Sequence, residues 1–307
     1  MKLLITGALG HIGSSLIRYL PNKNINISKI YLIDNLLSQR YISLFDLNKN
    51  IKFKFLDIDL ANCDINKIPK SDVTIHLGAK TDAAQSAKFK KEFLSNNLNS
   101  TKNLINYCNL KKSKLIFASS TSIYGPQSTT VDEQCIRRDL NPQSPYASIK
   151  LREERLISKE LLNSSYIILR LGTICGFSPG IRFHTAVNKF CFQASTDQPL
   201  TIWKTALNQR RPYLTLEDFN RSILFLLKKD YIKNDIFNLV SNNLTVKEIL
   251  KLISKYVHFK KTYVSHEIMN QLSYNVSTKK FKKLGFNFKS NIDNAISETL
   301  KRIENIK

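Results

Sequence analysis

Short apolar runs alternate with amphipathic stretches along the first half of the chain. Apolar runs with the length of buried strands lie at residues 2–6, 30–33, 51–56, 73–77, 114–118 and 166–171. Segments with apolar residues at helical spacing lie between them, at residues 14–20, 88–110 and 145–162. Strands that alternate with helices predict a parallel sheet with helices on both faces, because each crossover helix packs back onto the sheet. The predicted fold class is α/β, with a doubly wound parallel sheet.

The pattern changes after residue 172. A loop rich in Gly and Pro at residues 176–180 precedes a helical pattern at 181–194, a short strand at 199–203 and a helix at 216–227. The run at residues 236–240 is expected to return to the sheet, and a capping box at Thr245 and Glu248 is expected to open a helix over 246–257. We therefore expect a sheet domain of residues 1–172, joined by 215–240, and a smaller α+β lobe of residues 173–214 and 241–307.

A glycine-rich turn follows the first predicted strand and opens the first predicted helix. Its glycines are Gly7, Gly10 and Gly13. This context is typical of a dinucleotide site, because glycines let the backbone approach a pyrophosphate whose charge then lies at a helix N-terminus. Asp34 ends the second strand 34 − 13 = 21 residues after Gly13, where an acid binds the ribose hydroxyls and favours NAD over NADP. Arg40 follows and would soften that preference.

A second pattern with chemical meaning is the pair Tyr146 and Lys150, with Ser120 upstream. Residues four apart in a helix lie on one face, and an ammonium beside a phenol stabilises the phenolate. Such a phenolate could act as a base near pH 7, with the serine hydroxyl orienting the same substrate oxygen. Taken alone, the pair is also typical of a surface tyrosine packed over a lysine stem.

Together these motifs resemble those of the extended short-chain dehydrogenase/reductase family, in particular its UDP-glucose 4-epimerase-like nucleotide-sugar epimerases and dehydratases. The resemblance extends over nearly the whole chain, and its ordered motifs are Thr6-Gly7-x-x-Gly10-x-x-Gly13, Asp34-Asn35, Asp57-Ile58, Ile75-His76-Leu77-Gly78-Ala79, Asn97, Ser119-Ser120, Tyr124-Gly125 and Tyr146-x-x-x-Lys150. It implies a Rossmann domain that binds NAD and a C-terminal lobe that binds substrate.

The resemblance also implies roles for individual residues. Catalysis is expected from Ser120, Tyr146 and Lys150. NAD is expected to contact Gly7, Gly10, His11, Ile12, Gly13, Asp34, Asn35, Asp57, Ile58, Leu77, Gly78, Ala79, Asn97, Tyr146 and Lys150. A nucleotide-sugar substrate is expected to contact Thr81, Ser120, Thr173, Arg182, Asn188, Thr201 and Arg211, with an arginine such as Arg211 suited to phosphates. The alternative for each arginine is an ordinary solvent-exposed side chain.

The resemblance also discriminates between reactions. The family's 4,6-dehydratases carry an Asp-Glu pair after the catalytic hydroxyl, whereas this chain has Thr121 and Ser122. We therefore expect epimerisation through a 4-keto sugar, with a reductase or dehydrogenase using the same residues once as the alternative. Three departures leave the nucleotide and sugar open: Thr173 replaces a common asparagine, the segment 270–274 lacks a common arginine, and 203–209 replaces a glycine-containing turn.

Composition bears on partners and compartment. The chain has 47 Lys and Arg against 24 Asp and Glu, a formal charge of +23. The basic residues are spread widely, so we interpret them as a solvated surface. A non-catalytic RNA-binding relative remains an alternative, but no specific nucleic acid is expected. Five separated cysteines form no disulfide or metal pattern, and His76 is expected in the core. We expect a cytoplasmic enzyme without a membrane span, and the resemblance implies a homodimer.

Overall fold

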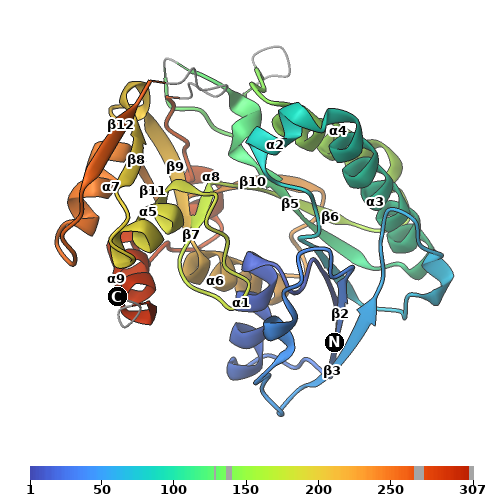
Figure 1. The fold of residues 1–307 in the computed structure, drawn as a ribbon. Helices are drawn as coiled ribbons and strands as arrows, with labels where there is room; N and C mark the ends of the chain where they lie inside the picture. The colour runs from blue at the N-terminus through green and yellow to red at the C-terminus, as the bar shows by residue number, and fades with distance from the viewer. Residues whose placement is uncertain (128, 136–139, 266–272, 304–307) are drawn as a thin grey trace.

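A seven-stranded parallel sheet forms the centre of the molecule in the computed structural model, which describes residues 1–127, 129–135, 140–265 and 273–303 (Figure 1). The strand order is β10-β6-β5-β4-β1-β2-β3. The strands are β1 (Lys2–Thr6), β2 (Lys29–Asp34), β3 (Lys52–Asp57), β4 (Val73–His76), β5 (Lys114–Ser120), β6 (Tyr166–Leu171) and β10 (Asp235–Leu239). This arrangement confirms the predicted doubly wound α/β fold.

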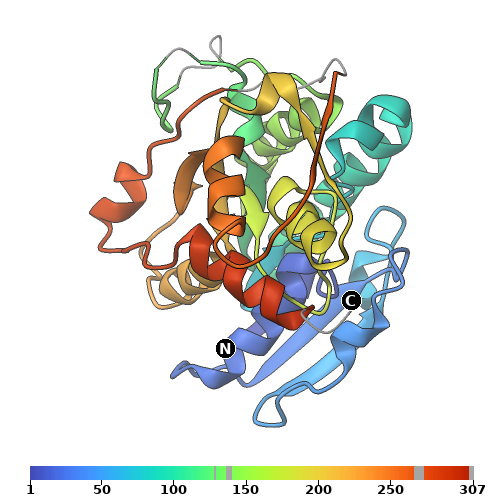
Figure 2. The same cartoon turned by 60° about the vertical axis from the view of Figure 1, so that its left-hand side comes forward.

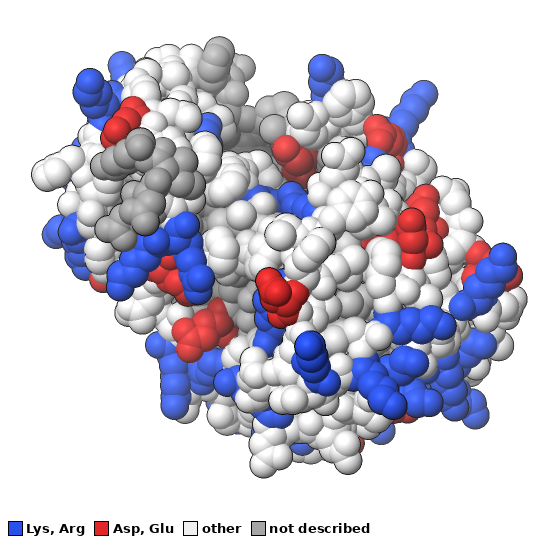
Figure 3. All heavy atoms as spheres, turned by 60° about the horizontal axis from the view of Figure 1, so that its bottom comes forward, with Lys and Arg blue, Asp and Glu red and all other residues white. Residues whose placement is uncertain are grey.

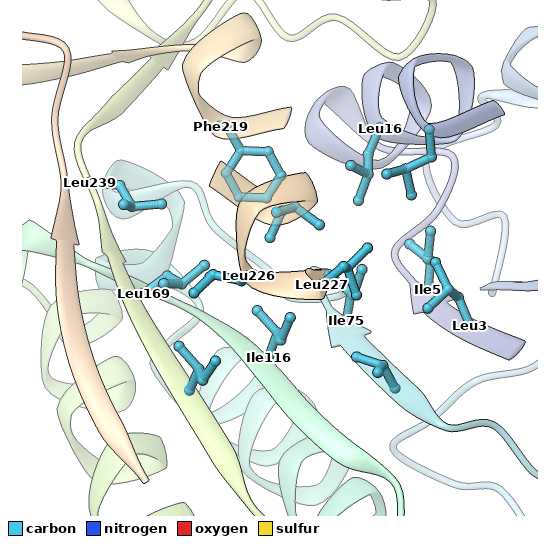
Figure 4. Packing of buried hydrophobic residues seen from close by; sticks show 14 of the residues in the cluster. Leu3, Ile5, Leu16, Ile75, Ile116, Leu169, Phe219, Leu226, Leu227 and Leu239 are labelled. Atoms are coloured by element: carbon cyan, nitrogen blue, oxygen red, sulfur yellow. The ribbon is translucent and has the colours of Figure 1, made fainter. Parts of the chain in front are cut away.

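Helices cover both faces of this sheet, and the side chains of successive strand residues point to opposite faces. Leu3 and Ile5 pack with α1 (His11–Tyr19) and α6 (Leu216–Leu227), in the cluster that Figure 4 shows. Leu4 packs on the opposite side with α3 (Lys90–Lys111) and α4 (Pro145–Glu160). A short helix, α2 (Ala83–Lys88), contacts α4. The central strands β1, β4, β5 and β6 are buried on two sides, which explains their continuous apolar runs, whereas the edge strand β3 has only exposed and half-buried positions.

The second part of the chain forms two small sheets and a separate apolar cluster. One sheet has the order β11-β9-β7, from β7 (Thr173–Cys175), β9 (Arg210–Thr215) and β11 (Asn242–Thr245), and the other pairs β8 (Leu200–Trp203) with β12 (Lys261–Val264). The cluster includes apolar residues of α5 (Ala186–Ser195), α7 (Val246–Ile253) and α9 (Ile292–Arg302), which Figure 2 shows as yellow, orange and red helices. The short α8 (Lys279–Lys283) packs instead on β10.

Some predicted boundaries are wrong. The helix expected over 181–194 begins only at α5, and in the segment before it the carbonyl of Arg182 accepts from the side chain of Asn188 instead of from a helical N–H. The helix expected over 246–257 ends with α7, and the expected capping box of Thr245 and Glu248 is present. The return of β10 to the large sheet agrees with prediction. The division into two functional domains remains a proposal.

The surface reflects the basic composition. On the face shown in Figure 3, Lys and Arg side chains are widely distributed, with acidic side chains between them. In the part of the chain that the structure describes, each helix is too short or too polar to cross a lipid bilayer.

Candidate active site

A cavity of about 1190 Å³ opens at the carboxyl ends of the central strands. This is the edge at which doubly wound sheets bind ligands. The volume exceeds the range of roughly 300–1,000 Å³ that is usual for one small ligand, so a dinucleotide and a second molecule could share it. Residues from both predicted parts of the chain line the cavity, including Gly10 from the first turn and Arg211 from β9.

The glycine-rich turn forms one wall of this cavity. Gly7 has a φ of 61°, and a Cβ atom there would lie 2.6 Å from the Cα of Gly78 at the end of β4. A Cβ at Gly13 would lie 2.4 Å from the carbonyl oxygen of Gly7. Side chains at these positions would clash with the backbone of the turn and of Gly78, so the glycines permit the tight packing of the turn. The N-terminus of α1 lies at the turn without a side-chain cap. The geometry fits the pyrophosphate of a dinucleotide.

A loop from the second part of the chain holds this turn in place. The Nε2 atom of His11 lies 2.8 Å from the carbonyl oxygen of Gly176, and Ser178 donates to the carbonyl of His11 at 2.8 Å. The backbone N–H of Gly180 donates to Ser14 Oγ at 3.0 Å. Burial lowers the pKa of His11 to about 4, so its imidazole is neutral near pH 7. The loop therefore couples the C-terminal part to the predicted dinucleotide site.

Asp34 organises the next part of the cavity wall. One oxygen of its carboxylate accepts from the N–H of Leu9 at 3.1 Å, and the other accepts from the N–H of Leu36 at 3.1 Å. The Asp34 carboxylate thus joins the end of β2 to the glycine-rich turn. The predicted residues Asn35 and Ile58 also line the cavity here.

The predicted catalytic residues converge at the cavity from β5 and α4. Ser144 caps α4 by accepting from the N–H of Ala147 at 3.2 Å, and Pro145 occupies the first turn, where its missing N–H is harmless. Tyr146 and Lys150 then lie one helical turn apart, and the 3₁₀ turn after β5 presents Ser120. Within this turn, Ser120 Oγ lies 2.8 Å from Ser122 Oγ.

The protonation of Tyr146 differs from the sequence-based expectation. Burial raises its pKa above the ordinary value, while Lys150 and a hydrogen bond with Ser120 lower it. The effect of Lys150 has the predicted direction, but burial outweighs it. The net lowering that the helix spacing suggested is therefore wrong for this structure, because the enclosure of the phenol could not be foreseen from the spacing.

The remaining predicted residues fall into two groups. Those that line the cavity are Ile12, Leu77, Gly78, Ala79, Thr81, Thr173, Arg182, Thr201 and Arg211, in addition to the residues described above. Arg182 is not simply solvent-exposed, because its guanidinium donates to the Thr81 hydroxyl and burial lowers its pKa.

Three predicted residues, Asp57, Asn97 and Asn188, are not among the lining residues. Asp57 is exposed at the end of edge strand β3, and Ile58 after it lines the cavity instead. Asn97 is buried and clamps the backbone of Lys80 at 2.9 and 3.0 Å. Asn188 is buried too, and it accepts from the N–H of Gly176 at 3.2 Å. These two asparagines support the wall rather than form it.

Sequence reasoning also missed several lining residues. Asp59, Ser122, Lys189, Trp203 and Tyr274 line the cavity but were not among the predicted site residues. Trp203 is 44% exposed, which is unusual for so large an apolar side chain and agrees with a place on a ligand-binding wall. Asp59 had a signal in its position two residues after β3. The expected departure at 270–272 lies outside the described residues.

His76 illustrates a correct structural interpretation. It is 2% exposed in β4, and its Nδ1 lies 2.6 Å from the hydroxyl of Thr6. Burial lowers its pKa to about 3. The prediction of a core histidine is confirmed.

A glycine cradle at the first β–α turn and a Ser-Tyr-Lys set beside it define a dinucleotide-dependent enzyme of the short-chain dehydrogenase type. The model of the NAD dependent epimerase/dehydratase family matches residues 3–239, and the chain belongs to this family. The family acts on nucleotide sugars with NAD as cofactor, and the glycine cradle and Asp34 fit that cofactor.

Comparisons with individual proteins agree with this assignment. The chain is 30% identical over 274 residues to a dTDP-D-glucose 4,6-dehydratase of Dictyostelium discoideum, with 82% of this chain and 62% of that protein covered. It is 28% identical to the uncharacterised UDP-glucose epimerase YtcB of Bacillus subtilis (strain 168), with 78% and 76% covered. The structure of MoeE5 in complex with UDP-glucuronic acid and NAD superposes with a TM-score of 0.85, at 22% identity and 98% coverage of both chains. The last comparison shows a shared fold.

Proposed function

We propose that this protein epimerises a nucleotide sugar through a transient 4-keto sugar. The observation that carries the proposal is the convergence of Ser120, Tyr146 and Lys150 at a cavity shared with the glycine cradle, while Thr121 and Ser122 bring no carboxylate to the catalytic turn. When bound, NAD supplies a hydride acceptor and then a hydride donor. Net redox change is zero in such a reaction, so the cofactor would stay with the protein.

The proton movements fall to this chain's own residues. Tyr146, as the phenolate, would take the proton of the sugar C4 hydroxyl and return it after the sugar has turned. The ammonium of Lys150 favours the phenolate, and the hydroxyl of Ser120 would hold the reacting oxygen in line. Burial keeps Tyr146 largely protonated in the ligand-free protein, so bound ligands would have to supply the remaining stabilisation of the phenolate.

Lining residues from the second part of the chain would bind the nucleotide. Arg211 of β9 and Arg182 of the loop before α5 are cations that line the cavity, and guanidinium groups suit diphosphate oxygens. Thr81, Thr173 and Thr201 add hydroxyl groups that could bind the sugar and nucleotide. In this interpretation residues 1–172, with 215–240, bind NAD, and residues 173–214 and 241–307 bind substrate. The unusual Trp203 would set part of the sugar specificity.

Two other reactions compete with epimerisation. A dehydratase is among the relatives, but elimination of water needs an additional acid and base, and positions 121 and 122 carry hydroxyl groups instead. A single-pass reductase or dehydrogenase would use Ser120, Tyr146 and Lys150 once and would consume or produce NADH. These reactions differ in cofactor stoichiometry, which makes them separable by experiment.

The test is native mass spectrometry of the purified protein, followed by NMR analysis of product formation with UDP-, GDP-, dTDP- and CDP-sugars. The expected result is a protein that carries NAD and inverts one sugar without added cofactor, with Tyr146→Phe retaining NAD but losing about 10²–10⁴-fold in rate. Turnover only with added NAD(H), accompanied by an absorbance change at 340 nm, would replace the epimerase proposal with the single-pass reaction. A 4-keto-6-deoxy product would indicate a dehydratase.

A further inference from the structure

Lys150 has a second buried neighbour besides Tyr146. Glu153, one helical turn further along α4, places its Oε2 atom 3.1 Å from the Lys150 Nζ. The two side chains are 0% and 3% exposed, respectively. The hydroxyl of Thr101, from α3, donates to the Oε1 atom of Glu153 at 2.6 Å. The carboxylate is thus enclosed between two helices and aimed at the ammonium group that the proposed reaction uses.

The next residue of α4 shows that Glu153 has a separate role. Glu154 pairs with Arg170 and accepts from Ser119, so the need of Arg170 for a counter-ion is already met. A buried carboxylate without a partner is strongly disfavoured, and Lys150 is the cation within ion-pair distance of Glu153. The Lys150 ammonium is therefore a positive neighbour of both the Glu153 carboxylate and the Tyr146 phenol.

The surroundings of this cluster contain few other charges among the described residues. Tyr146 and Glu154 share α4 with Glu153, and Arg182 approaches Tyr146 from the loop before α5. His76 of β4 is neutral, because burial lowers its pKa to about 3. From β5, the centre of the Phe117 ring lies 4.5 Å from Lys150 Nζ, and α3 contributes the uncharged Thr101.

We propose that Glu153 is a positioning residue of the proposed epimerase site: it holds the Lys150 ammonium in its buried place and weakens the pull of that ammonium on the Tyr146 phenol. The inference rests on the proposed function for its catalytic meaning, but the electrostatic relationship can be measured without turnover. Burial raises the pKa of the Glu153 carboxyl, but the Lys150 ammonium at 3.1 Å and the hydrogen bond from Thr101 both favour its carboxylate form.

The direction of the effect follows from charge alone. Glu153→Gln preserves the shape of the side chain and removes one negative charge 3.1 Å from Lys150. The Tyr146 and Lys150 pair then releases its first proton more easily, since removal of a nearby negative charge favours deprotonation. We expect the midpoint of phenolate formation at Tyr146 to fall by about one pH unit.

The experiment is a titration of phenolate absorbance at 295 nm on the purified holoprotein, within the pH range where circular dichroism stays native. The chain has 12 tyrosines, so the signal of Tyr146 is isolated by subtracting the same titration of a protein that also carries Tyr146→Phe. Thr101→Val is the matched control, because it removes the hydrogen bond of Glu153 and keeps its charge. It should lower thermal stability and leave the Tyr146 midpoint within a few tenths of a unit.

A lower midpoint in Glu153→Gln, with Thr101→Val unchanged, supports the inference. An unchanged or higher midpoint overturns it, because Glu153 would then be a neutral or purely structural side chain. If Glu153→Gln does not fold, Glu153→Asp serves as the second variant. Its shorter side chain withdraws the carboxylate from Lys150, so a smaller fall in the Tyr146 midpoint is expected. An unchanged midpoint in Glu153→Asp would count against the inference. Since the readout needs no substrate, an unsuccessful sugar screen would bear on the proposed function alone.

Discussion

Glu154 and Arg170 form a buried, doubly hydrogen-bonded ion pair, with Arg170 Nε 3.1 Å from Glu154 Oε1 and Nη2 2.8 Å from Oε2. Ser119 donates to the same carboxylate at 2.5 Å. The pair therefore ties α4, which carries Tyr146, to β6 and to the end of β5, which carries Ser120. Removing one partner of such a pair leaves an uncompensated charge in the interior.

Glu154→Gln is expected to lower the free energy of unfolding by about 3–5 kcal/mol. Urea denaturation followed by circular dichroism measures this loss. The control is Glu160→Gln, at the exposed end of the same helix, which should change the free energy by less than about 0.5 kcal/mol. Equal effects of the two substitutions would contradict a special role for the buried pair.

Gly7→Ala is expected to prevent NAD retention. A Cβ atom at Gly7 would lie 2.6 Å from the Cα of Gly78, and the φ of 61° is itself strained for alanine. Native mass spectrometry measures the cofactor that remains bound after purification. Gly285→Ala is the matched control, since Gly285 has a φ of 95° but open space around its Cβ position. It should lose about 1–2 kcal/mol of stability and keep NAD.

Ser120→Ala is expected to lower kcat by about 10²-fold, by removing a hydroxyl that orients the reacting oxygen. Ser122→Ala should have a smaller effect, because the proposed mechanism assigns the reacting oxygen to Ser120, and Ser122 contacts the Ser120 hydroxyl at 2.8 Å. Steady-state kinetics with the identified sugar compares the two variants. A larger loss in Ser122→Ala would move the catalytic assignment two residues along the turn.

The stability of the protein should fall between about pH 6.5 and pH 4. Burial holds the pKa of His76 at about 3 and that of His11 at about 4, below the ordinary value of about 6.5 in the unfolded chain. The unfolded state binds more protons in this window, so folding loses up to about 1.4 kcal/mol per pH unit for each histidine.

Urea denaturation at several pH values, with His76→Gln beside the wild type, measures this dependence. The variant should have the shallower slope below pH 6.5. Parallel slopes would show that His76 does not take up a proton on unfolding.

The family resemblance implies a homodimer in which α3 and α4 pack against their copies, and we propose that its formation depends on ionic strength. The exposed positions of α4 include Arg152, Arg155 and Lys159, and contact between two copies of this surface would bring like charges together. Salt shortens the range of that repulsion, to about 10 Å at 0.1 M. Light scattering after size exclusion should therefore show more dimer as salt increases, whereas a monomer at every salt concentration would exclude this interface.

Much of the fold could be predicted because its signals are local. Apolar runs of strand length, helical spacing of apolar residues and the glycine-rich turn each lie within a few residues, and together they indicated the parallel sheet that the structure has. The Tyr146 and Lys150 spacing likewise placed two side chains on one face of α4. The order of motifs added the family, which the comparisons confirm.

Contacts between distant segments were decided by the tertiary structure. Arg182 meets Thr81 across 101 residues, and His11 meets the carbonyl of Gly176 across 165 residues. Sequence alone could not show that Glu153 faces Lys150 rather than solvent, because the packing of α3 against α4 decides which polar positions are buried. The raised pKa of Tyr146 has the same origin. Spacing along a helix determines which groups are neighbours, whereas burial, which only the folded chain creates, determines how strongly they act on one another.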